Sequence, residues 1–356
     1  MKLNILHITP DFNYACGRSY YVFLLLKYLQ GNHNVHLITN GGDSFDRLEE
    51  NNISYSILKG LRSKNPITFA KNINEIKAFA KKNSIDIIHT HHRFAELIAI
   101  QALKFIKKNK PASVLTSLSI VKRKYNIEFK SDRIIAVSNS VKHMLVDKFR
   151  VKEKRISLIH NFTDTEEIRD LGIIAPRARE HGKFFNILAI GRFHHEKNFE
   201  TLLRAMNLLK DKNIKLILVG EGNNDIDYKR YISRKELNVE IIVPQKNLLQ
   251  YFQVADLCVL PSARDPFPNF MLQSGLHRVP FIGANVDGIG ELINNGENGL
   301  LFTSGNENEL AERILLFMND PELAQKCANK LHEDVVNNYT EEFIIPKVED
   351  LYRSIT

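Results

Sequence analysis

The sequence predicts an α/β protein with two doubly wound parallel sheets, one in each half of the chain. Short β-rich apolar runs alternate with amphipathic helical stretches along the chain, as in parallel sheets covered by helices on both faces. A length of 356 residues suits two domains better than one. One charged segment containing Gly and Pro, at 168–183, separates two such series, and we expect the halves to join there.

The first series fills residues 1–170. Apolar runs of strand length predict strands at 3–9, 34–39, 85–89, 113–118, 133–137 and 156–159. Helical periodicity predicts helices between them, at 20–29, 69–82, 94–107 and 140–148.

The second series fills residues 180–335. Its expected strands are 186–190, 215–219, 240–243, 257–260 and 280–284, with 300–302 closing the sheet. Its expected helices are 198–209 and 309–318, and a further helix should start near Asn269. Ligands of doubly wound sheets bind at the carboxyl ends of the strands, so a cleft between two such domains is the natural site.

Composition narrows the class of protein. Apolar residues make up 44% and charged residues 25%, which are ordinary values for a soluble domain. The three cysteines form no C-x-x-C pair, which argues against a disulfide framework or structural zinc and fits a reducing cytosol. No signal peptide or apolar run of spanning length is visible, so we expect a cytoplasmic protein.

Charge indicates an anionic partner. The formal net charge is +8, which favours nucleic acid, acidic lipid or phosphorylated small molecules. The sequence has no helix-turn-helix signature, RNP motif or zinc-finger spacing, so we expect no nucleic-acid binding.

A turn after the strand at 186–190 bears two cations. Arg192 and Lys197 lie five residues apart between a strand and a helix, where backbone N–H groups and positive charge suit a diphosphate. Taken alone, the pair could equally be solvated surface charge. The lone Gly220-x-Gly222 is weak evidence, because glycines often only permit a tight turn.

Two further patterns suggest metal ligands only superficially. Asp225-x-Asp227 falls in what we interpret as a polar loop, with no other hard ligand cluster beside it. His194 and His195 are adjacent, and adjacent side chains point in different directions. We therefore expect no metal site.

The second half resembles the nucleotide-sugar half of the GT-B glycosyltransferases, specifically the retaining family 4 (glycosyl transferases group 1). The resemblance rests on four motifs in order over about 120 residues. They are G-R-x4-K-N at Gly191, Arg192, Lys197 and Asn198; A-D-x4-P-S at Ala255, Asp256, Pro261 and Ser262; the E-x7-E segment, here a D-x-F-P-N variant, from Asp265 to Gln273; and the closing glycine turns at 288–291 and 296–301. Weaker matches (Gly17 and the D-x-I-H-x-H run at 86–91) extend it over roughly 1–340.

This resemblance implies transfer of a sugar from a nucleotide diphosphate sugar, of UDP or GDP type, without cofactor or metal. Residues 1–170 would bind the acceptor, 180–335 the donor, and a C-terminal helix at 336–356 would pack on the first domain. The implied donor-binding residues are Gly17, Arg192, Lys197, Asn269, Phe270, Gln273 and Glu291. Asp265 would contact sugar hydroxyls.

Three positions depart from the family pattern. Gln273 replaces the second acid and accepts hydrogen bonds only as a neutral amide. Arg278 stands where the family prefers Gly. The family's T-x-H histidine is missing after Thr116, and His91 or His92 would stand in for it, with an exposed loop histidine as the alternative.

Residues 101–133 interleave Lys and Arg with apolar residues. Such a segment suits peripheral contact with an anionic membrane on its cytoplasmic face, and a glycan, lipid-linked or cell-envelope acceptor would explain it. A solvated basic face is the alternative. Two other functions stay open: a catalytically degenerate GT-B partner or binding protein, and a sugar-nucleotide epimerase.

Overall fold

The structure, a computed structural model, describes residues 2–121, 128–169 and 184–356. The chain forms two compact units. Unit 1 comprises Met1–Asn161 and Glu342–Thr356, and unit 2 comprises Phe162–Glu341. Most of the expected join, at 170–183, lies outside the described residues.

Unit 1 contains a seven-stranded sheet in the order β3-β2-β1-β4-β5-β6-β7, with every neighbouring pair parallel. The strands are β1 (Asn4–Thr9), β2 (Asn34–Thr39), β3 (Ser54–Ile57), β4 (Ile87–Thr90), β5 (Ala112–Ser117), β6 (Arg133–Ala136) and β7 (Ile156–Leu158). The order reverses between β1 and β4, which is the switch point where doubly wound sheets bind ligands. Register there sets His7 opposite His89.

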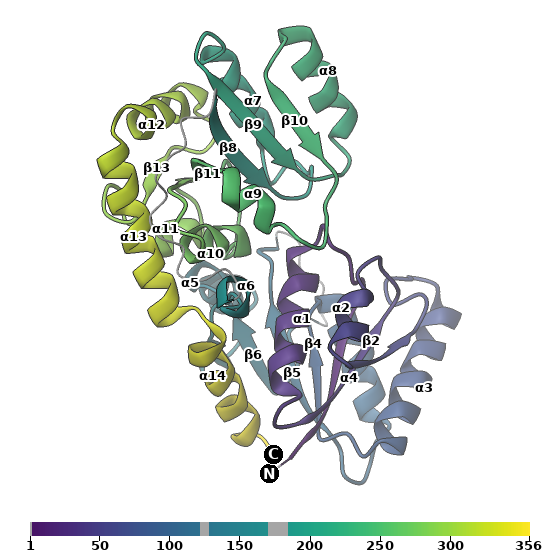
Figure 1. The fold of residues 1–356 in the computed structure, drawn as a ribbon. Coiled ribbons are helices and arrows are strands. Elements are labelled where there is room, and N and C mark those ends of the chain that lie inside the picture. The colour runs from purple at the N-terminus through teal and green to yellow at the C-terminus, as the bar shows by residue number, and fades with distance from the viewer. Residues whose placement is uncertain (1, 122–127, 170–183) are drawn as a thin grey trace. The chain divides into compact units, whose positions relative to one another are not determined.

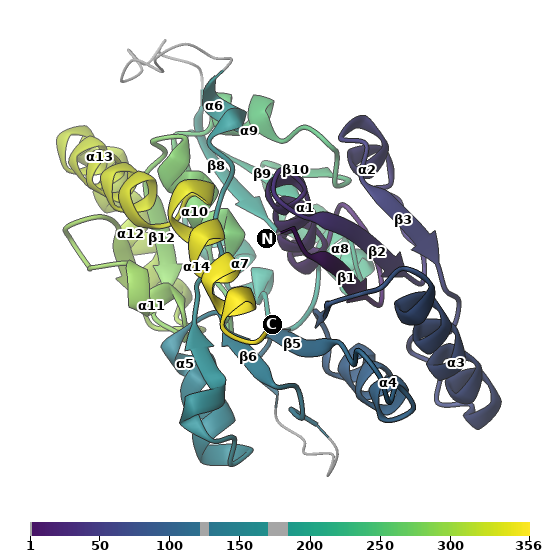
Figure 2. The same cartoon turned by 90° about the horizontal axis from the view of Figure 1, so that it is seen from below.

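Helices connect these strands and cover the sheet (Figure 1). They are α1 (Gly17–Leu29), α2 (Asp46–Glu50), α3 (Pro66–Lys82), α4 (Arg93–Lys104), α5 (Asn139–His143), a π-helical turn (Met144–Lys148), a 3₁₀ turn (Glu153–Arg155) and the C-terminal α14 (Glu341–Arg353). α3 and α4 lie side by side and share a core of aliphatic residues with β1 and β4 (Figures 1 and 2). All but the first residue of α14 belongs to unit 1.

Unit 2 contains a six-stranded parallel sheet in the order β10-β9-β8-β11-β12-β13. Its strands are β8 (Phe185–Ile190), β9 (Ile214–Val219), β10 (Val239–Ile242), β11 (Leu257–Leu260), β12 (Phe281–Ala284) and β13 (Leu300–Phe302). Its helices are α6 (Glu166–Arg169), α7 (Phe199–Leu208), α8 (Asp225–Lys235), α9 (Leu249–Val254), α10 (Asn269–Leu276), α11 (Ile289–Leu292), α12 (Glu307–Asn319) and α13 (Pro321–Asn338). The predicted class, two doubly wound parallel sheets, is confirmed.

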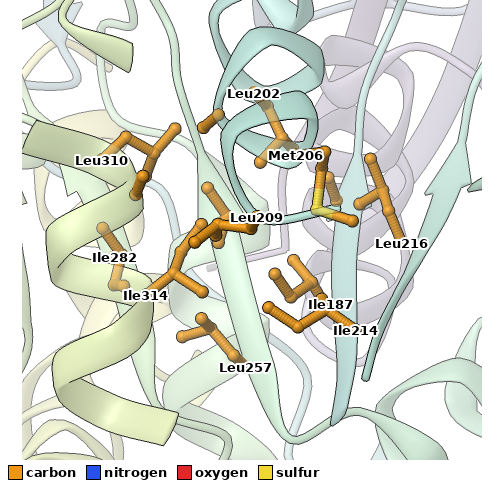
Figure 3. Close-up of a cluster of buried hydrophobic side chains, with 14 of the residues drawn as sticks. Ile187, Leu202, Met206, Leu209, Ile214, Leu216, Leu257, Ile282, Leu310 and Ile314 are labelled. Atoms are coloured by element: carbon orange, nitrogen blue, oxygen red, sulfur yellow. The ribbon is translucent and has the colours of Figure 1, made fainter. Parts of the chain in front are cut away.

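One face of the second sheet is sealed by α7 and α12. Leu202 and Met206 of α7 and Ile314 of α12 pack on Ile187 and Leu257 of the sheet, all at most 3% exposed (Figure 3). The apolar residues of both helices recur at helical spacing, so each helix presents one stripe to the strands. This packing fixes the corner between β8 and α7.

Several elements escaped the sequence prediction. β3 (Ser54–Ile57) is a polar edge strand with little apolar signal. α8 fully buries only Tyr228, and six of its eleven residues are charged, so its segment resembled a loop. α13 did have a start signal, because the Asp320 side chain accepts from Leu323 N at 2.9 Å and Pro321 occupies the first helical position.

A search of the helices within 2–121, 128–169 and 184–356 finds none with the length and apolar character needed to cross a bilayer.

Candidate active site

The cationic turn of unit 2 is anchored by an aromatic side chain. Phe193 is fully buried, and its N–H donates to Glu221 O at 2.8 Å. A Cβ on Gly220 would lie 2.1 Å from Gly191 O and 2.4 Å from the Phe193 ring. Gly220 is therefore needed so that the loop after β9 can pack closely on the turn after β8.

Lys197 reaches from this turn to the segment after β11. Its Nζ lies 2.5 Å from Asp265 Oδ2, with the side chains 26% and 7% exposed respectively. The backbone joins the same two segments, because Ala263 N donates to Glu196 O at 2.8 Å. Arg192, on the same turn, is exposed to solvent. Lys197 thus meets the predicted D-x-F-P-N segment, while Arg192 remains free to approach a ligand.

Asp265 belongs to a cluster of carboxylates. Its carboxylate also accepts from Ser262 Oγ at 3.2 Å, and its backbone N–H donates to Asp287 Oδ2 at 3.0 Å. Burial raises the pKa of Asp287; nearby Asp265 and Glu291 raise it further, while the Asp265 amide and Arg264 oppose the rise. Sequence reasoning missed Asp287, although it directly precedes the glycine turn at 288–291.

The glycine turn is pressed against the D-x-F-P-N segment. A Cβ on Gly288 would lie 1.8 Å from Pro266 O, and Gly288 N donates to Asp265 O at 3.0 Å. Asp287 itself adopts a φ of 41°. Only glycine at 288 permits this contact, which brings Asp287 beside Asp265.

α10 begins at Asn269, where the sequence predicted a helix start. Pro268 occupies the N-cap and makes no side-chain cap. The first N–H groups of a helix have no intrahelical acceptor, so this end offers donors and a positive dipole end. Phe270 is buried against Phe252, and Gln273 is only 7% exposed in the next turn.

α10 ends in a left-handed residue. Arg278 has a φ of 53°, and Arg278 N donates to Gly275 O at 3.1 Å. Residues that adopt this conformation at the end of a helix are most often glycines. The family's preference for Gly at this position therefore has a backbone cause, and Arg278 adopts it at some cost.

In unit 1, Gly17 is the exposed first residue of α1. His92 caps α4, because its Nδ1 accepts from Phe94 N at 3.2 Å. The side chain is half-buried. Burial, reinforced by the charges of Arg18 and Arg62, lowers the pKa of His92 to about 3. The ring is therefore neutral at pH 7, and Nε2 must bear its proton.

His91 is not an exposed loop residue, which corrects one of the two alternatives from the sequence. It is 1% exposed, and its Nε2 lies 3.0 Å from Nδ1 of His7. The third member, His89, lies 2.6 Å from the hydroxyl of Tyr352 and 2.7 Å from that of Thr116. Burial lowers the pKa of all three histidines, that of His7 to about 3.

This histidine cluster is the one place, within the described part of the chain, where three His, Cys, Asp or Glu ligand atoms approach within 4.8 Å of one another. Sequence reasoning named no metal ligand and did not single out His7. The alternating strand pattern could have placed His7 on the sheet, but only the β1–β4 register sets it opposite His89.

The D-x-D pattern does not lie in a loop. Asp225 and Asp227 occupy the first turn of α8. Asp225 pairs with Lys229 at 2.7 Å and Asp227 with Arg230 at 3.5 Å, both within the helix. His194 and His195 have ring centroids 4.0 Å apart on the cationic turn.

Two Rossmann-like units, one with a cationic strand-to-helix turn beside a carboxylate cluster and a helix start, define the class of GT-B glycosyltransferases. Two family profiles match the chain: Glycosyltransferase Family 4 over residues 17–167 and Glycosyl transferases group 1 over residues 174–334. The chain belongs to the group 1, family 4 glycosyltransferases and is an enzyme of that kind.

Individual relatives are distant. The capsular polysaccharide biosynthesis glycosyltransferase CapM of Staphylococcus aureus is 25% identical over 62% of this chain and 61% of its own length. The N-acetyl-alpha-D-glucosaminyl L-malate synthase of Bacillus anthracis is 25% identical over 78% of this chain and 76% of its own. The crystal structure of Anabaena HepE in complex with UDP-glucose superposes with a TM-score of 0.82 at 18% identity, covering 99% of this chain and 100% of HepE. The similarity to HepE shows a shared fold.

Proposed function

We propose that this protein transfers a sugar, with retained anomeric configuration, from a UDP- or GDP-type nucleotide sugar to a hydroxyl of a glycan, lipid-linked or cell-envelope acceptor. Unit 2 binds the donor and unit 1 the acceptor. The pairing of Lys197 with Asp265 is the observation that carries the proposal. The names of the relatives, which include a capsular polysaccharide enzyme and a UDP-glucose complex, support the substrate class.

The diphosphate is assigned to Arg192, Lys197 and the first amides of α10. A leaving nucleoside diphosphate gains charge on its phosphate oxygens, and positioned cations and N–H groups stabilise that charge. Lys197 is held 2.5 Å from Asp265, so its ammonium is positioned before any ligand arrives. Gly17, the exposed first residue of α1, has no Cβ and is kept as a sequence-based candidate for phosphate contact.

The sugar and nucleoside are assigned to the acidic residues and the amide. Asp265 accepts from sugar hydroxyls, and the neighbouring Asp287 holds the backbone of Asp265 in place by accepting from its N–H at 3.0 Å. Glu291 and Gln273 face the nucleotide portion. A neutral amide accepts more weakly than a carboxylate, so Gln273 costs about 1–2 kcal/mol of nucleotide affinity relative to an acid.

The proposed transfer step needs no basic residue of the protein to remove the acceptor proton. The bond between the anomeric carbon and the phosphate oxygen breaks, the acceptor oxygen bonds to the same face of that carbon, and the acceptor proton passes to the leaving phosphate. His92 offers a neutral N–H donor on the acceptor side. His91, 1% exposed, acts through its contact with His7 rather than on substrate. No metal is assigned to the step, and full turnover in excess chelator is the expected result.

A donor panel tests the proposal. Purified enzyme is incubated with UDP- and GDP-sugars, with and without candidate acceptors, and released nucleotide and sugar products are measured. Nucleotide release that depends on acceptor, with a product of unchanged anomeric configuration by NMR, is expected. Free epimerised sugar nucleotide would indicate the epimerase instead. Donor binding with no turnover on any acceptor would indicate a binding protein and contradict transfer.

Membrane contact is proposed for the basic edge of unit 1. A groove of about 1320 Å³ at the amino ends of β4 and β5 is lined by Lys81, Lys107, Lys108 and Lys110, and beside them Phe105 is 60% exposed. Part of the predicted basic segment, 122–127, lies outside the described residues. Each lysine near an anionic surface contributes about 1 kcal/mol, and an exposed ring adds interfacial burial.

Vesicle sedimentation tests this contact. Vesicles with anionic phospholipid should retain the protein, and K107Q/K108Q should weaken binding roughly 30-fold, given about 1 kcal/mol for each of the two lysines. The matched control, K210Q/K212Q, removes two exposed lysines from unit 2. Equal effects of the two pairs, or equal binding to neutral vesicles, would contradict a specific basic edge.

A further inference from the structure

Beyond the donor site, unit 1 contains a cluster of charged side chains at the switch point of its sheet. Asp11 follows β1, Arg18 lies in the first turn of α1, and Arg62 precedes α3. Arg18 Nη2 pairs with Asp11 Oδ1, and Arg62 Nη2 lies 2.6 Å from Asp11 Oδ2. Two guanidinium groups therefore share one carboxylate, which leaves this trio with one net positive charge.

The cluster is only partly satisfied by the protein. The side chain of Arg62 is 54% exposed, so it can move without breaking the packing of the fold. The Nε of Arg18 is buried and has no hydrogen-bond partner among the residues that the structure describes. A guanidinium normally presents its Nε and one Nη together to an oxyanion, and here Asp11 occupies only the Nη2 side.

His92 follows β4, next to β1 at the switch point, and the charges of Arg18, Arg62 and Asp11 all act on its ring. Since Nδ1 accepts from Phe94 N and the ring is neutral, the remaining Nε2–H is a donor. Burial alone would raise the pKa of Asp11, but the two arginines lower it overall, so Asp11 stays a carboxylate.

We propose that Arg18 and Arg62, with His92 Nε2–H, bind an oxyanion of the acceptor, a phosphate or carboxylate, in exchange for Asp11. This rests on the proposed function, because it assigns the acceptor of the same transfer an acidic group. In the structure, Asp11 pairs with both guanidinium groups. An incoming oxyanion takes over Arg62 and the free side of Arg18. An acceptor without an acidic group would leave these donors unmatched and would bind more weakly.

The test uses the full-length protein labelled with ¹⁵N and titrated at constant ionic strength with inorganic phosphate in one arm and succinate in the other. Backbone amides at 11–19 and 92–94 should shift in at least one arm, and the tighter arm identifies phosphate or carboxylate as the acceptor group. R62Q should weaken binding by about fivefold, because Arg62 is 54% exposed and water screens part of its charge-assisted contact. D11N should strengthen it by a similar factor, because the competing carboxylate is removed.

R204Q is the matched control, since it removes an exposed arginine paired with Glu200 in unit 2 and should leave the binding unchanged. R18K retains the positive charge but lacks the planar paired N–H donors of a guanidinium, and should also weaken binding. No shift at 11–19 and 92–94 up to about 50 mM of either anion, beyond the weakest range of specific binding, overturns the proposal. So does weaker binding by D11N, which would mean that Asp11 is itself needed.

Donor binding is followed in a separate titration with UDP and GDP, read from the amides at 191–198. Shifts there without shifts in unit 1 would leave the transferase proposal standing and refute the acceptor oxyanion alone.

Discussion

Replacing Lys197 by Gln tests the central contact of the donor site. Lys197 Nζ lies 2.5 Å from the Asp265 carboxylate, which is 7% exposed. Gln retains much of the side-chain length but loses the charge, so Asp265 is left with Ser262 as its side-chain donor. A hydrogen bond to a charged group contributes about 1.5–3 kcal/mol net. Because Lys197 is itself 26% exposed, we expect a loss of about 2 kcal/mol in the stability of unit 2.

The matched control is Lys215→Gln. Lys215 pairs with Glu240 at the nearly equal distance of 2.6 Å, but the two side chains are 33% and 52% exposed. Exposed pairs contribute about 0–1 kcal/mol because water and salt screen them. The two variants differ mainly in burial, so the control should lose much less stability than K197Q.

Two assays read the result. Urea unfolding by circular dichroism gives the stability change, and hydrogen exchange of the peptides around 186–200 assigns it to unit 2. Donor turnover should fall about 10²–10³-fold in K197Q, the usual loss when one group that stabilises transition-state charge is removed. Equal destabilisation by K197Q and K215Q, or transfer by K197Q at the wild-type rate, would refute the assignment.

Three further outcomes follow from single positions. Gly288→Ala should lower the stability of unit 2 by at least about 2 kcal/mol and abolish transfer, because its Cβ would lie 1.8 Å from Pro266 O. The control Gly296→Ala has a φ of 84° but no atom within 4 Å of the added Cβ, so it should lower stability in thermal unfolding by only about 1 kcal/mol. Arg278→Gly should stabilise the protein by about 0.5–1 kcal/mol, since glycine adopts the φ of 53° without strain; a loss of stability in calorimetry would contradict this. Unit 1 should lose stability as pH falls below about 6.5, because burial lowers the pKa values of His7, His89 and His91. The unfolded chain then binds protons that the folded unit does not, and each such histidine lowers the free energy of unfolding by up to about 1.4 kcal/mol per pH unit. A flat profile of stability from pH 7 to 5 would refute this prediction.

Much of the fold follows from local signals in the sequence. Strands such as β2, β11 and β13 were predicted at their exact observed bounds, because short apolar runs flanked by turn residues are local features. α8 and β3 were missed, since a charged helix and a polar edge strand are stabilised by neighbours that a local window does not contain. The start of α10 at Asn269 was predicted because two prolines and an apolar run surround it.

The candidate site also combines features encoded locally in the sequence with features that depend on the fold. The sequence alone determined the cationic turn, Asp265 and the expected helix start, because each lies in a short stretch whose spacing survives without contacts. Only the tertiary structure decided that Asp287 touches the Asp265 amide, that His7 stands opposite His89, and that Arg18 and Arg62 share Asp11. These pairs are separated by 7 to 82 residues or belong to different strands and loops, and their meeting depends on parallel register and on close backbone packing, which no single stretch of sequence encodes.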